Sequence, residues 1–426
     1  MTALTGFLMI AVMIIALVKF KTLPITVFAT LPVIAAFLLG FGPVEVFTMT
    51  AKGIISVLPT AALFVGSITY FGIMSDAGLF ERPVSFLMKK LKPNLFSVLA
   101  LAIMIGMISH LDGSGTTTIM ITVPAMLPIA KKLNMRIYPL ALVITETIAV
   151  MNFLPWGGPL GRAATVVGSD AVTLWHRILP VQVFGILLLF AGAWILAKQE
   201  EKAGYGIKNI QLETTGEAKQ SDLARPSLFW FNLILTILII VLLFIGCPAF
   251  LPFLIGIGIA LPVNYGKDGN RAQEARIKDH AKDVVPMIIT IIGAGMFLGV
   301  LNDGGIIEAM ANVIISIIPA ALGGILHVIM GLLAMPLSLV FEADTMIFGI
   351  VPIVAEICAN YGIPAMKTAL TMSIGHNVAV GLCMTNATVY FALGLFGLEY
   401  GETLKYSFLK VLVFGSILIL FSVIVL

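Results

Sequence analysis

The stretch Phe71-Gly72-Ile73-Met74-Ser75-Asp76-Ala77-Gly78-Leu79-Phe80-Glu81 decides the fold, because it recurs with substitutions as Leu298-Gly299-Val300-Leu301-Asn302-Asp303-Gly304-Gly305-Ile306-Ile307-Glu308. Subtraction of the residue numbers puts the two stretches about 227 residues apart. Nearly the same offset carries Pro59 onto Pro286 and Val123-Pro124 onto Val351-Pro352. A constant offset over this distance indicates two copies of one unit. In a membrane protein, paired units are typical of a transporter whose site lies where the copies meet.

The composition predicts an all-α polytopic membrane protein. The chain is 59% hydrophobic and 11% charged, with a mean hydropathy of +1.08. A water-soluble chain of this length could not bury so much apolar surface. Apolar runs near the length of a membrane span recur at 2–18, 23–41, 55–75, 138–154, 178–197, 228–246, 249–265, 285–302, 364–397 and 406–426. The lipid bilayer is therefore the first expected partner. The net charge of +3 is too small to indicate nucleic acid.

The distribution of basic residues predicts the orientation of the chain in the membrane. We expect a first repeat over 1–197, a cytoplasmic linker over 198–226 and a second repeat over 227–426, each repeat with five transmembrane helices and one re-entrant hairpin. If residue 1 lies outside, all Lys and Arg residues fall in cytoplasmic segments except Lys52, Arg162, Arg177 and Lys367. The odd number of crossings then makes the repeats inverted, with both termini extracytoplasmic. The expected location is the cell inner (plasma) membrane.

The first polar interruption is Ser109-His110-Leu111-Asp112-Gly113-Ser114-Gly115-Thr116-Thr117-Thr118, between two short apolar arms. Two short arms and a polar tip predict a re-entrant hairpin, because non-helical backbone at that depth must be buried in protein or line a wet cavity. The hydroxyl groups, freed N–H groups and the following helix N-terminus suit carboxylates. Asp112 suits a cation or a proton. The alternative is a Ser/Thr-rich contact between helices.

The equivalent interruption in the second copy is Glu342-Ala343-Asp344-Thr345. Two carboxylates in an apolar context require a cation, a proton or a hydrogen-bond donor. The alternative is a tip that lies in bulk water.

Each copy has a second break, in its fourth crossing. In the first copy the break is Asn152-Phe153-Leu154-Pro155-Trp156-Gly157-Gly158-Pro159-Leu160-Gly161-Arg162, and in the second it lies between Gly375-His376-Asn377 and Thr388, with Thr385-Asn386 at the positions of Gly157-Gly158. Paired discontinuous helices indicate a transporter site. Arg162 could bind a substrate carboxylate or pair internally with Asp112, Glu146 or Asp170. Glu146 could carry a proton or make a structural hydrogen bond.

The chain resembles the citrate–metal–proton symporter family of the ion transporter superfamily. The resemblance rests on Leu111-Asp112-Gly113-Ser114-Gly115-Thr116-Thr117-Thr118, on Leu154-Pro155-Trp156-Gly157-Gly158-Pro159 through Arg162-Ala163-Ala164-Thr165, and on Asp344, Phe348-Gly349 and Pro352. It implies a homodimer with scaffold and transport domains that works by an elevator motion. The chain departs from the family pattern at Phe341-Glu342-Ala343-Asp344, Gly375-His376-Asn377 and Thr385-Asn386-Ala387-Thr388.

We therefore predict a secondary-active transporter of a small organic acid, a di- or tricarboxylate like citrate, coupled to H⁺ or Na⁺. A divalent metal carried with the substrate is one alternative, and no resident metal or other cofactor is expected. The residues expected to bind substrate are Ser114, Gly115, Thr116, Thr117, Gly157, Gly158, Arg162, Thr345, Asn377, Thr385 and Asn386. Those expected to couple transport to an ion or proton are Asp112, Glu146, Asn152, Glu342 and Asp344. A cation/proton antiporter of the same superfamily is the alternative. An intramembrane enzyme is not expected, because the sequence offers no nucleophile–base pair.

Overall fold

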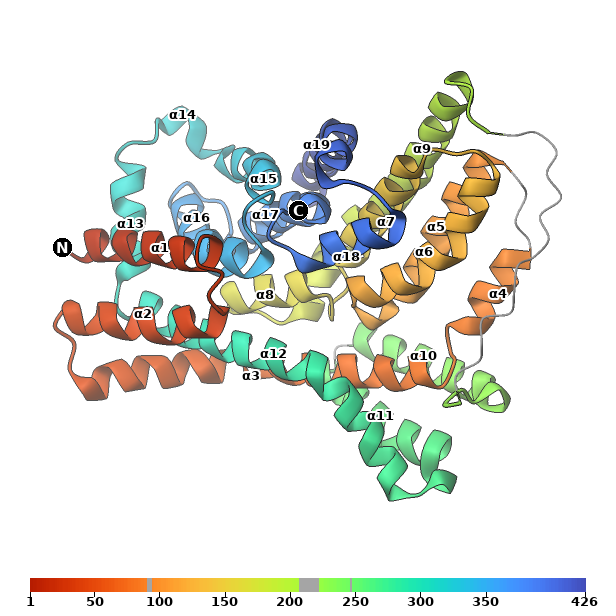
Figure 1. Ribbon diagram of the computed structural model, residues 1–426. Helices are drawn as coiled ribbons and strands as arrows, with labels where there is room; N and C mark the ends of the chain where they lie inside the picture. Colours follow the sequence, from red (N-terminus) through yellow and green to blue (C-terminus); the bar gives the residue numbers. More distant parts are fainter. Residues whose placement is uncertain (90–93, 207–221, 246) are drawn as a thin grey trace.

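The computed structural model describes residues 1–89, 94–206, 222–245 and 247–426, and all its elements there are helical (Figure 1). The α-helices are α1 (Thr2–Val18), α2 (Pro24–Leu38), α3 (Pro43–Asp76), α4 (Glu81–Lys89), α5 (Leu95–Ser109), α6 (Gly115–Lys132), α7 (Ile137–Met151), α8 (Gly158–Val166), α9 (Ala171–Lys202), α10 (Phe229–Phe244), α11 (Phe250–Tyr265), α12 (Asn270–Asp303), α13 (Ile306–Ile315), α14 (Ala320–Gly323), α15 (Leu326–Leu337), α16 (Val351–Asn360), α17 (Ala365–Ala379), α18 (Ala387–Phe396) and α19 (Tyr400–Val425). Short 3-10 helices are η1 (His110–Asp112), η2 (Pro226–Leu228), η3 (Gly266–Asp268) and η5 (Val380–Leu382), and η4 (Asp344–Ile350) is a π-helix. The all-α prediction is confirmed.

Seven helical segments of the described part are long and apolar enough to cross a membrane, or eight if the bent pair α17–η5 and α18 is one span. Five further apolar helices have 10–17 residues, and they include α1, α2 and α7. The sequence predicts about ten crossings because it counts these shorter segments as full spans. The predicted linker over 198–226 falls partly outside the described residues, which omit 207–221.

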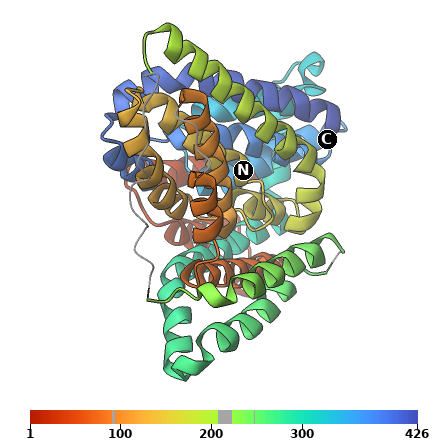
Figure 2. The same ribbon diagram turned by 90° about the vertical axis from the view of Figure 1, so that its right-hand side faces the viewer.

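Two layers of helices lie against each other (Figures 1 and 2). The lower layer is built around α3 and α12, and α2 and α11 pack on these two helices. The upper layer holds the paired helices α5–α6, the broken helices α7–α8 and α17–α18, and the long helices α9 and α19. Large apolar side chains on the outer faces are exposed, as on α10 at Trp230, Ile234 and Leu238, which is typical of a surface in contact with lipid.

The closest packing in the lower layer joins α3 to α12, two helices of 34 residues each. A Cβ atom added to Gly53 would overlap the carbonyl oxygen of Gly295 and lie 2.9 Å from Cα of Gly299. Glycine at these positions therefore allows the two backbones to touch. At the other end of the contact, Gly72 lies against the ring of His280. An offset of 227 residues carries Gly53 onto His280 and Gly72 onto Gly299.

Ion pairs close both ends of this contact. Lys52 Nζ lies 3.1 Å from Asp303 Oδ2, and Arg276 Nη1 lies 3.2 Å from Asp76 Oδ2. Asp76 and Asp303 are the equivalent residues of the repeated stretch that opens the sequence analysis. Each therefore pairs with a basic residue near the start of the opposite helix, and α3 and α12 run antiparallel.

The remaining helices also occur in equivalent order. Helix α7 and its counterpart α17 have 15 residues each, and both end at a break. The hairpin α5–α6 corresponds to α15 with η4–α16, the half-helix α8 to α18, and α9 to α19. Within each set the neighbours also correspond, since α5 packs on α7 and α9 while α15 packs on α17 and α19.

Candidate functional site

The first hairpin tip, residues 110–118, is a sharp turn between α5 and α6. Gly113 adopts a left-handed conformation with φ of 75°, which reverses the chain. Asp112 Oδ1 accepts a hydrogen bond of 2.8 Å from the backbone N–H of Ser114. The Ser114 hydroxyl oxygen in turn caps α6 by accepting from the N–H of Thr117 at 3.2 Å. The N-terminus of α6 therefore opens at the tip, with Gly115 and Thr116 in its first turn.

This tip is fixed to the break in its own copy, residues 152–158. The indole Nε1–H of Trp156 donates to the carbonyl oxygen of Leu111 at 2.8 Å. His110 is hydrogen-bonded through Nε2 to Asn152 Oδ1 at 3.1 Å, and through Nδ1 to the Thr118 hydroxyl at 2.8 Å. Both His110 and Trp156 are buried. They join the hairpin to the broken helix as one unit.

The second hairpin tip, residues 338–344, is fixed to the second break in the same manner. The backbone N–H of Met384 donates to the carbonyl oxygen of Leu339 at 2.8 Å. The Thr385 hydroxyl donates to the carbonyl oxygen of Val340 at 3.2 Å. The Ser338 hydroxyl is hydrogen-bonded to Nδ1 of His376 at 2.7 Å.

The two units share one equivalent hydrogen bond. An offset of 228 residues carries Trp156 onto Met384 and Leu111 onto Leu339. In the first copy the donor is a side chain, whereas in the second copy it is the main chain. The attachment of each tip is therefore equivalent in position and different in chemistry.

One ion pair connects the two copies within this region. Arg162 Nε, in α8, lies 2.6 Å from Asp344 Oδ1, at the start of η4. The side chains are 12% and 16% exposed, so the pair is shielded yet still reachable from the surface. The internal partner of Arg162 is thus Asp344, and neither Asp112, Glu146 nor Asp170 is paired with it. The alternative that the second tip lies in bulk water does not hold for Asp344, whereas the Glu342 side chain is exposed.

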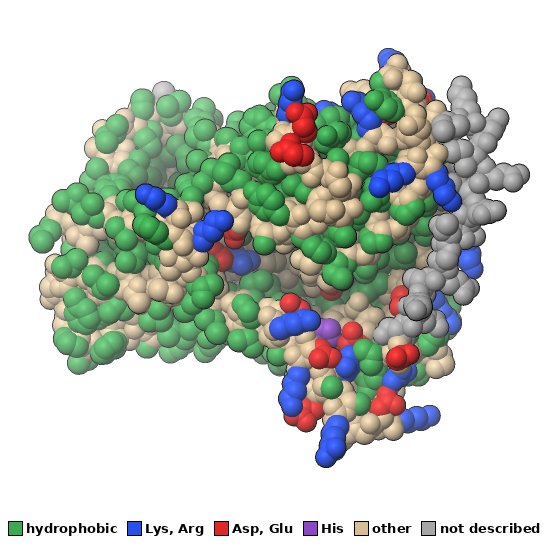
Figure 3. Space-filling model, in the orientation of Figure 1, with side chains coloured by type: hydrophobic (Ala, Val, Ile, Leu, Met, Phe, Trp, Pro, Cys, Tyr) green, Lys and Arg blue, Asp and Glu red, His purple; other side chains and the backbone are tan. Residues whose placement is uncertain are grey.

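Glu342 lies near this pair, within electrostatic reach of Asp344 and Arg162 and beside the Thr385 hydroxyl. Gly158, the first residue of α8, is positioned so that an added Cβ would lie 2.7 Å from Arg162 Nη1. Residues from the first break and the second tip therefore meet around one cation and two carboxylates. Figure 3 shows a hollow between the two layers, with acidic and basic side chains at one end.

The first tip faces the second break. A Cβ atom added to Gly115 would lie 3.8 Å from Cγ2 of Thr388 and 3.6 Å from Cγ2 of Ile148. Asn386 caps α18 by accepting from the N–H of Thr388 at 2.9 Å. The N-termini of α6 and α18 thus open close together, each with a polar cap. Helix N-termini carry partial positive charge and bind anions.

The structure brings together the predicted residues Arg162, Asp344, Glu342, Thr385 and Gly158. Ser114, Gly115, Thr116, Thr117 and Asn386 lie at the adjoining first tip and second break, and Gly157 is the N-cap residue of α8. Thr345 is buried in η4, Asn377 is buried in α17, Glu146 is buried in α7, and Asn152 binds His110. The Asp112 carboxylate accepts a hydrogen bond from the backbone N–H of Ser114. The roles of Trp156 and Ser338 were missed, because a tip-to-break hydrogen bond has no sequence signature.

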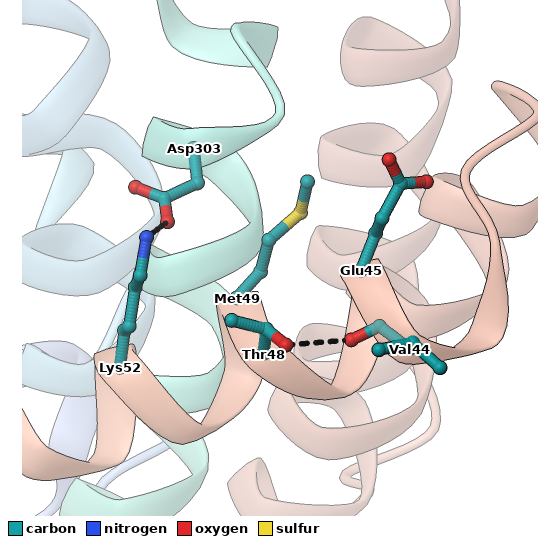
Figure 4. Close-up of a pocket in the computed structure, with 6 residues that line it drawn as sticks. All are labelled: Val44, Glu45, Thr48, Met49, Lys52 and Asp303. Carbon is teal, nitrogen blue, oxygen red and sulfur yellow. Dashed lines mark hydrogen bonds and ion pairs between the residues drawn. The ribbon is translucent and has the colours of Figure 1, made fainter.

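A separate surface depression lies away from these breaks, between the start of α3 and the end of α12 (Figure 4). It is lined by Val44, Glu45, Thr48, Met49, Lys52 and Asp303. Of its three charged residues, Lys52 and Asp303 pair with each other at 3.1 Å, and Glu45 Oε2 accepts a hydrogen bond of 2.8 Å from the N–H of Gly42. In the part of the chain that the structure describes, no group of three or more His, Cys, Asp or Glu side chains could hold a metal ion.

Comparison with known proteins identifies close relatives. Residues 8–375 match the sequence model of a family described as citrate transporter. Two Bacillus subtilis (strain 168) proteins are similar over nearly their full length. A citrate transporter is 31% identical over 408 residues, covering 96% of this chain and 95% of that protein. A Mg(2+)/citrate complex secondary transporter is 32% identical over 432 residues, covering 100% and 99%.

A solved structure shares the fold. The crystal structure of the Alcanivorax borkumensis YdaH transporter, described as having an unusual topology, superimposes with a TM-score of 0.60 at 14% sequence identity. The match covers 88% of this chain and 87% of that chain. At this identity the likeness concerns the arrangement of helices alone.

Proposed function

The chain belongs to the citrate transporter family, and we propose that it carries a citrate-like di- or tricarboxylate across the membrane as a complex with a divalent cation. Membership makes it a multi-pass membrane transporter for an organic anion, and not an enzyme. The name of one relative specifies a Mg(2+)/citrate complex. The proposal for this chain rests on its own charged groups.

The observation that carries the proposal is the ion pair between Arg162 and Asp344. A metal–citrate complex has a carboxylate side and a cation side. The Arg162 guanidinium can bind a carboxylate through two parallel hydrogen bonds. Asp344 and Glu342 can supply oxygen ligands to a hard divalent cation, with citrate and water filling the remaining coordination positions. Binding would then replace the ion pair between Arg162 and Asp344 by two new ones. Arg162 would pair with a citrate carboxylate, and Asp344 would pair with the divalent cation.

Free citrate fits the same residues poorly. A trianion placed beside Arg162 would also lie close to two carboxylates, and like charges at short range in a partly dry site repel strongly. A divalent cation removes two of the three negative charges. The hydroxyls of Ser114, Thr116, Thr117, Thr345 and Thr385, the backbone at Gly115, Gly157 and Gly158, and the amides of Asn377 and Asn386 complete the proposed substrate contacts. Asp112, Glu146, Asn152 and the two carboxylates remain the proposed route for the coupling ion, H⁺ or Na⁺.

The proposed architecture is a pair of inverted repeats with termini outside, a scaffold domain, a mobile transport domain and a homodimer in the plasma membrane. The repeat offset converts the contact between Gly53 and Gly299 into the contact between His280 and Gly72. This exchange supports a two-fold relation between the copies. The separation into two layers supports a scaffold of α1–α3 and α10–α12 and a mobile unit of α5–α9 and α15–α19. Cysteines introduced at residues 2 and 199 test the orientation, since only the first should react with an impermeant reagent outside intact cells.

The transport proposal is tested with purified protein in proteoliposomes. Labelled citrate uptake should require Mg²⁺ or another divalent cation and should fall when a chelator is present in excess. Malate and succinate with the same cation define the substrate class. Absence of organic-acid uptake under any imposed gradient, together with proton efflux driven by an external cation, would overturn the proposal in favour of a cation/proton antiporter.

A further inference from the structure

Glu146 is a buried carboxyl group that forms no ion pair with any of the described residues. It lies in α7, the half-helix that leads into the first break, and is 5% exposed. Its Oε2 atom has no hydrogen-bond partner in the part of the chain that the structure describes. Other carboxylates at helix contacts behave differently, since Asp344 pairs with Arg162, Asp76 with Arg276, and the fully buried Glu200 with Arg136.

Among the described residues, no salt bridge includes Glu146. Helix α7 is surrounded by α5, α6, α9, α17, α18 and α19. The titratable groups of these surroundings nearest to the breaks have other partners: His110 binds Thr118 and Asn152, and Asp112 binds Ser114. His376 binds Ser338 through Nδ1, whereas its buried Nε2 has no partner among the described residues. At the far end of α7, Arg136 is bound to Glu200.

A second buried polar side chain that lacks a partner among the described residues lies in α17, which packs on α7. Asn377, in α17, is fully buried, and neither the oxygen nor the nitrogen of its amide has a partner within the described residues. The neighbour of Glu146, Thr145, touches Gly381, whose added Cβ would lie 3.0 Å from Cβ of Thr145. Asn377 lies near the end of α17, four residues before Gly381, which belongs to the 3-10 helix η5. Buried polar groups without partners are rare in native structures and require an explanation.

We propose that Glu146 is the proton carrier of the transport cycle, a coupling role that rests on the proposed function. An isolated carboxylate ion in this surrounding would have no compensating charge, whereas the protonated acid can be buried. A proton taken from water binds a carboxylate oxygen of Glu146 while the unit of α7 and the first tip faces one side. The same proton returns to water when the unit faces the other side.

The test compares two modes of transport in proteoliposomes that contain the full-length protein. Net uptake of labelled citrate with Mg²⁺ is measured with an imposed pH gradient, and exchange is measured with unlabelled citrate and Mg²⁺ on both sides without a gradient. A gradient of about one pH unit can concentrate the substrate about tenfold for each proton carried with it. The variant is Glu146→Gln, which keeps the shape of the side chain and cannot change its charge. The matched control is Glu308→Gln, which alters an exposed carboxyl in α13.

For Glu146→Gln we expect exchange at the rate of the control, but no accumulation of citrate in response to the pH gradient. Glu146→Asp keeps a carboxyl group and should retain that accumulation, with its pH dependence displaced. If Glu146→Gln concentrates citrate as the control does, Glu146 is not the carrier. The inference is also overturned if both Glu146→Gln and Glu146→Asp lose exchange, or if Na⁺ alone drives the accumulation of citrate by the unmodified protein. Absence of exchange in the unmodified protein instead refutes the proposed function.

Discussion

Arg162 and Asp344 lie 182 residues apart in the sequence, yet their side chains meet at 2.6 Å. The arginine belongs to the helix that follows the first break, and the aspartate begins the helix that follows the second hairpin tip. The pair therefore joins elements of the two copies. A buried pair of this kind is costly to separate unless a ligand replaces each partner, so its two members are sensitive reporters of binding.

Arg162→Ala should weaken citrate binding. Loss of a hydrogen bond to a charged group costs about 1.5–3 kcal/mol, which corresponds to an increase of about 10- to 100-fold in the apparent KM for uptake. Arg177→Ala, at an exposed arginine in α9, is the matched control. An unchanged apparent affinity in Arg162→Ala would remove Arg162 from the substrate site.

Asp344→Asn should change the dependence of uptake on the metal ion. The amide is a weaker ligand for a divalent cation, and its introduction frees Arg162 from an internal competitor. We expect the Mg²⁺ concentration for half-maximal uptake to rise, while inhibition by free citrate becomes stronger. Titration of uptake with Mg²⁺ at fixed citrate measures both effects. The double variant Arg162→Ala/Asp344→Asn shows whether the two effects depend on each other, and strict additivity would argue against a shared ligand.

Trp156→Phe should loosen the first hairpin tip. Phenylalanine keeps an aromatic ring against Phe71 and Phe253 but leaves the carbonyl oxygen of Leu111 without its donor. An unsatisfied buried acceptor costs about 1–3 kcal/mol. The expected result is a lower thermal unfolding temperature in detergent and slower uptake. Trp194→Phe, at an exposed tryptophan, should change neither, and equal behaviour of the two variants would refute a role for this hydrogen bond.

Gly53→Ala should separate α3 from α12. The added methyl group would overlap the carbonyl oxygen of Gly295, and overpacking of this kind costs about 1–3 kcal/mol or more. Gly192→Ala is the matched control, because nothing lies within 4 Å of its added Cβ. Alanine there should stabilise α9 by about 0.5–1 kcal/mol. Thermal unfolding in detergent compares the two, and a neutral Gly53→Ala would mean that the helices are less closely packed than described.

The sequence predicted the helical class and the positions of both tips and both breaks, because prolines, glycines and charged residues interrupt apolar runs in a recognisable manner. It also predicted Arg162 and Asp344 as site residues. Their pairing could not be predicted, since it depends on how α8 approaches η4 in space. The sequence also marked only the apolar runs 55–75 and 285–302, whereas α3 and α12 continue through the more polar segments that precede these runs. A helix continues through such a segment when i to i+4 pairs such as Glu274–Lys278 support it.

The equivalent hydrogen bonds at the two tips differ in a way that affects how variation can act on each copy. The bond to Leu111 is made by the Trp156 side chain, so a single codon change can abolish or weaken it. The bond to Leu339 is made by the main chain of Met384, and among the standard amino acids only proline would remove the donor. Natural drift and laboratory selection can therefore alter the mobility of the first hairpin gradually, while the second keeps its attachment through almost every substitution at position 384.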